Sequence, residues 1–259
     1  MKLVINHQTH YFYETAVKRS NQYIRLTPQS FGHQQVNSWQ LASQGVCYSQ
    51  LDGFGNVWSS LTLAEPHTEL LIMAQGEVEL IDQVEKIRDD RLSPMIFMHA
   101  TDATVCHAPL KAFLAEQVKT ADRASLIHLA GAILEHMPYT PKATSVETSA
   151  ADAFDLGQGV CQDHTQVFLA CVRELKLPAR YVSGYLFTKD QTHLASHAWA
   201  EVYMDGFWYC FDVSNQLFTP SQHVQIAIGR DYLDACPVRG VRQGGGQESM
   251  RTLVQVLAA

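Results

Sequence analysis

Three residues whose side chains can together transfer an acyl group follow one another along the second half of the chain: Cys161, His197 and Asp212. A thiolate attacks a carbonyl carbon, an imidazole moves the proton, and a carboxylate bonded to the other imidazole nitrogen fixes the tautomer. The pattern therefore predicts a cysteine-dependent site with Cys161 as nucleophile, His197 as base and Asp212 as the residue that orients the base.

Cys161 is predicted to begin a helix. Apolar residues follow it at steps of three and four as far as Leu175, and Pro178 closes the segment. Unpaired N–H groups and the positive end of the helix dipole stabilise a thiolate relative to a thiol, and the same N–H groups could hold an oxyanion. Gly157 and Gly159 would let the chain turn and a substrate approach. The competing interpretation is that Cys161 only packs on the apolar face of its helix.

A hairpin signal relates His197 to Asp212. The pair 205–206, Asp-Gly, favours a two-residue type I′ turn, and the register that follows places Asp212 opposite Trp199. Asp212 is then two residues from the partner of His197, on the same face, with about 7–8 Å between backbones. A bulge would move Asp212 to the other face, so this prediction depends on a regular ladder.

Each partner of the cysteine also has a plainer interpretation. His197 lies in an apolar strand, where a hydrogen-bonded core histidine is common. Asp212 ends an aromatic run, so it should be partly buried and in need of a partner, which His197 can supply. Trp199 shares a face with His197 and is either a wall of the site or plain core, whereas Glu201 is expected to be solvated.

The chain as a whole predicts an α+β fold. Short stretches of β-branched and aromatic residues with turns between them predict an N-terminal antiparallel β-sandwich domain over residues 1–85. Residues 86–110 are the predicted linker, and residues 111–259 the catalytic domain. In that domain, helical periodicity gives way to strands, so the nucleophile should start a helix packed on an antiparallel sheet.

Composition excludes several classes of protein. With 19 basic and 26 acidic residues, the net charge of −7 offers no general attraction for nucleic acid or anionic lipid, so neither is an expected partner. No stretch has the ~20 apolar residues of a membrane span, and the first residues lack a secretory signal, which predicts a cytoplasmic protein. The six cysteines are expected to be free thiols. No cofactor or metal is expected, and the oligomeric state is not indicated.

Several ordered blocks of sequence carry a resemblance to one family. They are Gly159–Asp163 (GVCQD), Pro178–Tyr185 (PARYVSGY), His197–Glu201 (HAWAE), Phe211-Asp212 with Asn215, and Gly229–Tyr232 (GRDY), preceded near the N-terminus by Arg25–Pro28 and Asp52–Asn56. In this order they resemble the bacterial transglutaminase-like family, including its N-terminal β domain. The resemblance covers nearly the whole chain.

The resemblance implies a papain-like or transglutaminase-like core whose triad maps onto Cys161, His197 and Asp212. It implies a cysteine protease or acyltransferase that forms a thioester from a peptide or amide bond and passes the acyl group to water or to an amine. The substrate would be a peptide or protein, with Gly159, Trp199 and Tyr185 as candidate substrate-binding residues.

The chain departs from the family's pattern at two places. His164 stands where the family usually has an aromatic residue, and Val213-Ser214 replaces the usual Pro-Thr or Pro-Ser. Neither departure removes a catalytic group, but both bear on substrate preference and on the shape around the nucleophile.

Two other functions compete with the enzyme. Cys161 and His164, with His193 and His197, have spacings seen among zinc ligands. Four residues of extended strand span ~13 Å, so the last two histidines could share a metal only if the chain between them were looped. The other competitor is a non-catalytic interaction module that retains the fold, although such a scaffold has no need of all three triad residues.

Overall fold

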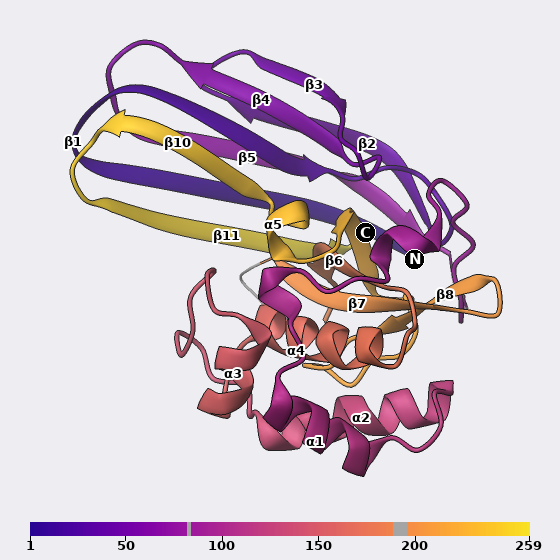
Figure 1. Cartoon of the computed structure of the whole chain (residues 1–259). Coiled ribbons are helices and arrows are strands. Elements are labelled where there is room, and N and C mark those ends of the chain that lie inside the picture. The colour runs from indigo at the N-terminus through magenta and orange to yellow at the C-terminus, as the bar shows by residue number, and fades with distance from the viewer. Residues whose placement is uncertain (82–83, 189–195) are drawn as a thin grey trace.

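The computed structural model describes residues 1–81, 84–188 and 196–259. They form three layers (Figure 1): a large sheet on one side, a group of helices on the other, and a four-stranded sheet between them. The mixed fold with mostly antiparallel strands agrees with the prediction.

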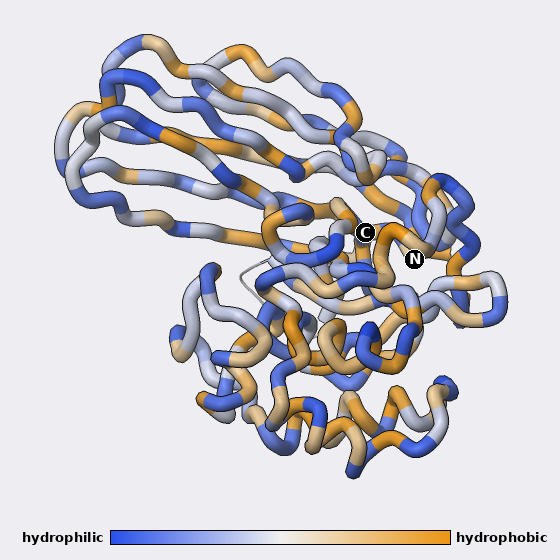
Figure 2. The backbone as a smooth tube through the Cα atoms, viewed as in Figure 1, coloured by the Kyte–Doolittle hydropathy of each residue, from blue (hydrophilic) through white to orange (hydrophobic). Residues whose placement is uncertain are grey.

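The large sheet is centred on one long strand. Its strands are β1 (Lys2–Thr27), β2 (Gln34–Ser43), β3 (Cys47–Leu51), β4 (Val57–Leu63) and β5 (His67–Leu80). The first half of β1 pairs with β5 and the second half with β4, and β2 and β3 extend the sheet beyond these neighbours. Residues of contrasting hydropathy follow one another along β1 and β5 (Figure 2), and much of each strand alternates between buried and more exposed positions, so one face of these two strands is buried.

The last two strands of the chain return to this sheet. β10 (Val238–Gly244) pairs with the second half of β1, and β11 (Glu248–Ala258) with the first half. The sequence analysis, which grouped these residues with the catalytic domain, did not foresee this pairing. In the described chain, the seven strands form one hydrogen-bonded network rather than the two separately bonded sheets of the expected sandwich, because β1 belongs to both halves.

The helical layer holds α1 (Ala108–Gln117), α2 (Arg123–His136), α3 (Ala150–Leu156) and α4 (Cys161–Glu174). The predicted apolar stripe of α2 is buried at Leu126, Leu129 and Ile133. α4 begins at Cys161 as predicted, and its residues 163–173 are all buried because it lies between the other helices and the middle sheet. In the part of the chain that the structure describes, no helix is long and apolar enough to cross a membrane.

The predicted linker carries two short 3₁₀ helices, η1 (Pro94–Phe97) and η2 (Asp102–Thr104). It is tied to the middle sheet at its start, where the backbones of Ile87 and Trp208 exchange two hydrogen bonds of 2.8 and 2.9 Å. The buried ring of Phe97 packs edge-on against Trp208. The linker therefore lies against the sheet instead of standing apart from it.

The middle sheet has the order β8-β7-β6-β9. Its strands are β6 (Ala179–Leu186), β7 (His197–Met204), β8 (Phe207–Phe211) and β9 (His223–Gly229), and the short helix α5 (Tyr232–Ala235) follows β9. The predicted hairpin register is confirmed from Met204–Phe207 through Ala200–Phe211. Asp212 is the next residue after β8, so it lies beside the start of β7.

Two amide side chains of the N-terminal sheet, one at the start of β2 and one in the loop before β4, bind the outer edge of β9. Gln34 donates from Nε2 to the Gln225 carbonyl at 2.9 Å and accepts the Gln225 N–H through Oε1 at 2.8 Å. Asn56 makes the same pair of bonds with Ile228, both of 2.8 Å. Each amide imitates the backbone of a neighbouring strand, so polar groups at the edge of β9 are satisfied across the junction.

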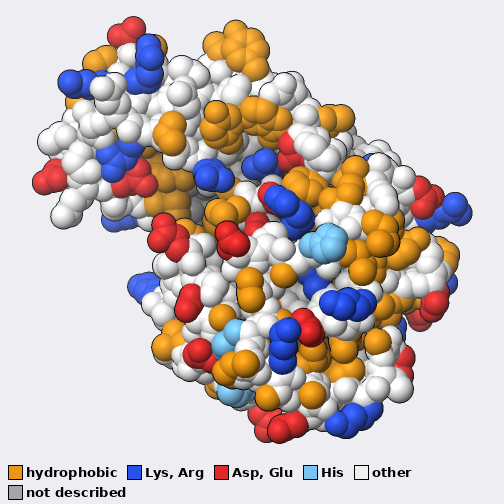
Figure 3. Space-filling model, in the orientation of Figure 1, with side chains coloured by type: hydrophobic (Ala, Val, Ile, Leu, Met, Phe, Trp, Pro, Cys, Tyr) orange, Lys and Arg blue, Asp and Glu red, His pale blue; other side chains and the backbone are white. Residues whose placement is uncertain are grey.

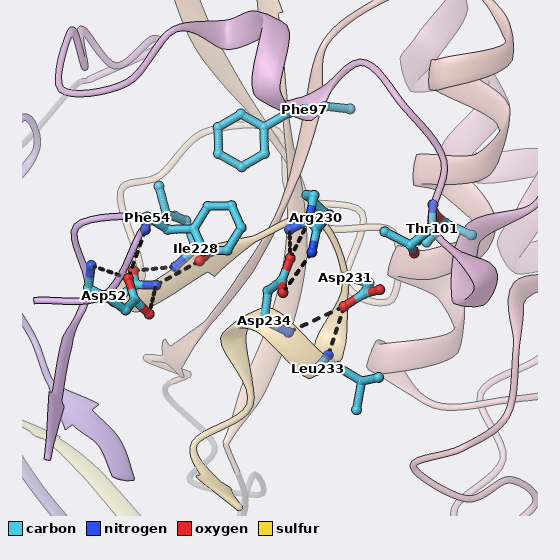
Figure 4. A network of polar contacts seen from close by, with 12 residues as sticks. Asp52, Phe54, Phe97, Thr101, Ile228, Arg230, Asp231, Leu233 and Asp234 are labelled. Atoms are coloured by element: carbon cyan, nitrogen blue, oxygen red, sulfur yellow. Dashed lines mark hydrogen bonds and ion pairs between the residues drawn. The ribbon is translucent and has the colours of Figure 1, made fainter. Parts of the chain in front are cut away.

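Asp52 orders the loop that carries Asn56 (Figure 4). Its carboxylate accepts the N–H groups of Phe54 and Asn56 at 2.9 and 3.0 Å and the Nε–H of Arg25 at 2.9 Å. Beyond Ile228, Arg230 is paired with Asp234 at the start of α5. Specific hydrogen bonds between polar groups therefore join the two sheets.

Charged side chains of both signs are intermixed on the face drawn in Figure 3. A surface that binds polyanions would gather basic side chains, whereas on this face they are mixed with acidic ones, in keeping with the net charge of −7.

Candidate active site

Cys161 lies at the first turn of α4, where Asp163 holds the preceding backbone. The Asp163 carboxylate accepts the Val160 N–H at 2.8 Å and the Thr144 hydroxyl at 2.6 Å. Burial raises the pKa of Asp163. Gly159 leaves room for this arrangement, because a Cβ there would lie 2.7 Å from the Cβ of Asp163. These contacts fix the backbone that leads into α4, so the Cys161 thiol is held at the N-terminus of the helix.

The His197 ring lies between the thiol and the carboxylate. Its Nε2 is 2.7 Å from Oδ2 of Asp212, and the Cys161 thiol lies close enough to act on the pKa of the ring. Because Nε2 is bonded to Asp212, Nδ1 is the ring nitrogen that is left for the thiol. Burial alone would lower the pKa of His197, but the charge of Asp212 and the bonds to Asp212 and Cys161 outweigh it and raise the pKa to about 10.

The Asp212 carboxylate is fully buried and bonded on all sides. Besides His197, it accepts the Asn215 N–H at 3.2 Å, the Asn215 side-chain amide at 3.0 Å and His223 Nε2 at 3.0 Å. Burial would raise the pKa of Asp212, but the two histidines hold it well below its usual range. The structure thus brings together all three residues that the sequence predicted for the site.

The three predicted substrate-binding residues are buried and have other contacts. Tyr185 is fully buried at the junction with the large sheet, where its hydroxyl lies 2.9 Å from Nδ1 of His7. Trp199 is fully buried and its ring stacks near His197, with 6.1 Å between ring centroids. Gly159 accommodates Asp163, as described above. The structure therefore gives no support for substrate contacts by the side chains of Tyr185 and Trp199.

Glu201 corrects an expectation. It is fully buried rather than solvated, because it pairs with the guanidinium of Arg180 at 2.7–2.8 Å. Arg180 also pairs with Asp89 at 2.8 Å, which links the linker to β6. Glu201 lies 3.4 Å from the indole nitrogen of Trp199, so this ionic group supports the wall next to His197.

The two departures from the family's pattern contact each other. Nε2 of His164 donates to the Met137 carbonyl at 2.7 Å, so Nδ1 can accept the hydroxyl of Ser214, 2.8 Å away. Burial lowers the pKa of His164. Helix α4 and the segment after Asp212 are therefore joined by this hydrogen bond.

Asn215 and His223 are site residues that the sequence reasoning did not identify. Asn215 belongs to one of the sequence blocks that resemble the family. It follows Asp212 by three residues, a spacing that allows its side chain to hydrogen-bond back to the Asp212 carboxylate. No comparable signal exists for His223, since the residues between Asp212 and β9 form no hairpin that would fix a register.

A metal could use only part of the set proposed from sequence. Both nitrogens of His164 are hydrogen-bonded, and His193 lies outside the described residues. Within the described ranges, the possible ligand atoms of His197, Asp212 and His223 lie within 4.8 Å of one another. The hydrogen bonds of the two histidines to Asp212 account for this spacing.

Comparison with known proteins agrees with this fold. Residues 3–79 match the bacterial transglutaminase-like N-terminal region, and residues 112–213 match the transglutaminase-like superfamily. The chain therefore belongs to the transglutaminase-like superfamily and carries the N-terminal region of its bacterial members.

Relatives extend over almost the full chain. An uncharacterized protein of Mycobacterium leprae is 29% identical over 98% of each chain. An uncharacterized protein of Mycobacterium tuberculosis is 26% identical over 95% of this chain and 89% of its own length. A crystal structure described as a "Putative Cysteine Protease" from Cytophaga hutchinsonii superimposes with a TM-score of 0.81 at 22% identity, covering 99% of this chain and 90% of the other.

Proposed function

We propose that this protein is a cysteine-dependent acyl-transfer enzyme that acts on peptide or amide bonds through a thioester on Cys161. The observation that carries the proposal is that Cys161, at the start of a helix, lies near the His197 ring, which is hydrogen-bonded to Asp212. The raised pKa of His197, about 10, favours an imidazolium beside the sulfur near neutral pH, and an imidazolium stabilises a thiolate.

In the first half of the reaction the Cys161 sulfur attacks the carbonyl carbon of the substrate and a C–S bond forms. The oxygen gains negative charge, which the first N–H groups of α4 are placed to stabilise. The C–N bond then breaks, and the leaving amine takes the proton that His197 carried. A thioester on Cys161 and a neutral His197 result.

In the second half an acceptor attacks the thioester. His197 accepts a proton from the attacking water or amine, and the C–S bond breaks to release the Cys161 thiolate. The protonated His197 then pairs with this thiolate again, as it did before the reaction. Throughout, Asp212 holds Nε2 of His197, so Nδ1 remains directed at the reacting atoms. Water as acceptor makes the enzyme a peptidase or amidase, and an amine makes it a transamidase.

Trapping the intermediate tests this proposal. Wild-type protein is mixed with an activated ester, p-nitrophenyl acetate, and with short peptides, quenched in acid and mapped by mass spectrometry. We expect an acyl group on Cys161, released faster by water or by an added primary amine according to the natural reaction. The Cys161→Ala protein should carry no acyl group at this position and should not turn over. Full turnover by Cys161→Ala would exclude Cys161 as the nucleophile, whereas a wild-type protein with neither acylation nor turnover would favour the interaction module.

A further inference from the structure

A second histidine donates to the carboxylate that holds His197. His223 lies at the start of β9, and its Nε2 is 3.0 Å from Oδ2 of Asp212, the same oxygen that lies 2.7 Å from Nε2 of His197. An ionised carboxylate only accepts hydrogen bonds, so both rings present an N–H to this oxygen. The orientation of the Asp212 carboxylate is therefore set by two imidazoles from two different strands.

We propose that His223 is a positioning residue for acyl transfer: it fixes the Asp212 carboxylate, and through it the His197 ring, in the orientation that Cys161 requires. The proposal rests on the proposed function. It assigns His223 no contact with substrate, since its side chain is fully buried and acts only through Asp212.

The backbone of His223 is itself held in place. Its N–H donates to the Pro220 carbonyl at 3.1 Å, and its carbonyl accepts Nε2 of His33 at 2.9 Å. His33 belongs to the turn between β1 and β2, and it is fully buried. The large N-terminal sheet thus supports β9 at the residue that bonds to Asp212, which gives that sheet a role in the site.

The ring of His223 is also held by packing. Trp199 lies against it, with 4.8 Å between ring centroids, and the indole also stacks near His197, whose ring centroid is 6.1 Å from those of both Trp199 and His223. On β6, which lies between the two histidine strands, Gly184 leaves room for the indole. A Cβ at Gly184 would lie 2.7 Å from Trp199 and 2.0 Å from the Val224 carbonyl. Trp199 therefore packs against both imidazoles and limits the movement of the His223 ring.

A purely space-filling role explains His223 poorly. Among the described residues, its Nδ1 has no hydrogen-bond partner although the ring is fully buried. An unpaired buried nitrogen costs free energy that a leucine of similar volume would avoid. Among the residues that the structure describes, the bond to Asp212 is the one hydrogen bond of the ring, and a leucine could not make it.

The test compares two substitutions that differ in this bond. His223→Gln keeps an N–H donor at similar reach, whereas His223→Leu keeps the volume and removes the donor. His7→Leu, at another buried histidine in the large sheet, controls for the general cost of losing a buried imidazole. Each full-length protein is assayed for kcat and KM on p-nitrophenyl acetate, for the rate at which iodoacetamide modifies Cys161, and for its thermal midpoint.

We expect His223→Leu to lower kcat and the alkylation rate about 10- to 100-fold, the range for residues that orient a functional group, with little change in KM. His223→Gln should recover most of the loss, and His7→Leu should change the thermal midpoint but not kcat. If His223→Leu has wild-type kcat, or His223→Gln is as slow as His223→Leu at an equal thermal midpoint, the proposal is wrong. A wild-type protein with neither turnover nor selective alkylation of Cys161 would instead refute the proposed function, and the positioning role with it.

Discussion

The side chains of His164 and Ser214 lie 2.8 Å apart, although they come from positions 50 residues apart in the chain. Each replaces a residue that is usual in the family, and each supplies what the other needs: a buried acceptor and a hydroxyl donor. They connect the helix of the nucleophile to the segment that follows the triad carboxylate. The two departures from the family's pattern thus form one local unit rather than two independent changes.

This pairing predicts coupling between His164→Phe and Ser214→Ala. Either single change leaves a buried polar group without its partner, at a cost of about 1–3 kcal/mol in the free energy of unfolding. The double variant removes both groups, so it should be more stable than the sum of the single effects by about 1 kcal/mol. Urea unfolding of the four proteins measures this difference, and additive effects would show that the contact contributes no coupling.

Asp212→Asn should impair catalysis far more than it impairs folding. The asparagine side chain keeps the size but presents an N–H₂ group as well as an oxygen, so His197 loses its defined tautomer. We expect a loss in kcat of roughly 10²–10⁴-fold. Steady-state kinetics on the ester measures it, with circular dichroism as the control for folding. Unchanged kcat in a folded protein would remove Asp212 from the mechanism.

The buried ions beside Trp199 predict that one substitution is worse than two. Glu201→Leu leaves Arg180 with an uncompensated charge on this side, and such losses cost about 3–5 kcal/mol. Replacing both, as Arg180→Met with Glu201→Leu, should cost clearly less, because no charge remains to be desolvated there. Asp89, which also pairs with Arg180, would still have Arg91 as a partner. Chemical denaturation of the single and double variants decides the point.

His7 predicts that the protein loses stability in mild acid. Burial lowers the pKa of this histidine from 6.5 to about 4, so between these pH values the ring is protonated in the unfolded chain and neutral in the folded one. The stability contributed by the neutral ring is present above pH 6.5 and is lost as the pH falls toward 4, by about 3 kcal/mol.

The His7→Gln variant tests this directly. The fall in its unfolding free energy between pH 6.5 and 4 should be smaller than in the wild type by that amount. His10→Gln, at a partly exposed histidine on the same strand, serves as the control. Equal pH dependence in wild type and His7→Gln would contradict the burial effect.

The sequence could predict two parts of the site, the register between His197 and Asp212 and the helix start at Cys161, because local signals set them. The Asp-Gly turn fixed the register that places Asp212 beside the start of β7, and the apolar stripe with Pro178 marked the helix that begins at Cys161. Both are short-range features, governed by turn chemistry and helical periodicity.

Contacts between distant segments could not be predicted in the same way. Glu201 occupies a strand position that is polar in sequence, and only the approach of Arg180 from β6 explains its burial. The pairing of the last two strands with β1, and the bond between His223 and Asp212, join segments that no turn relates. Such pairings depend on tertiary packing, for which a single sequence carries little direct signal.

The most direct test of the account is the relative reactivity of the cysteines. All six are free thiols, and Cys47, like Cys161, is partly exposed, so exposure alone predicts similar rates for these two. Burial raises the pKa of Cys47, whereas Cys161 adjoins an imidazolium and a helix N-terminus. With limiting iodoacetamide near neutral pH and site-resolved mass spectrometry, we expect Cys161 to react at least ~10-fold faster than Cys47, and this preference to vanish in His197→Ala. Equal rates at the two cysteines in the wild-type protein would contradict the central claim.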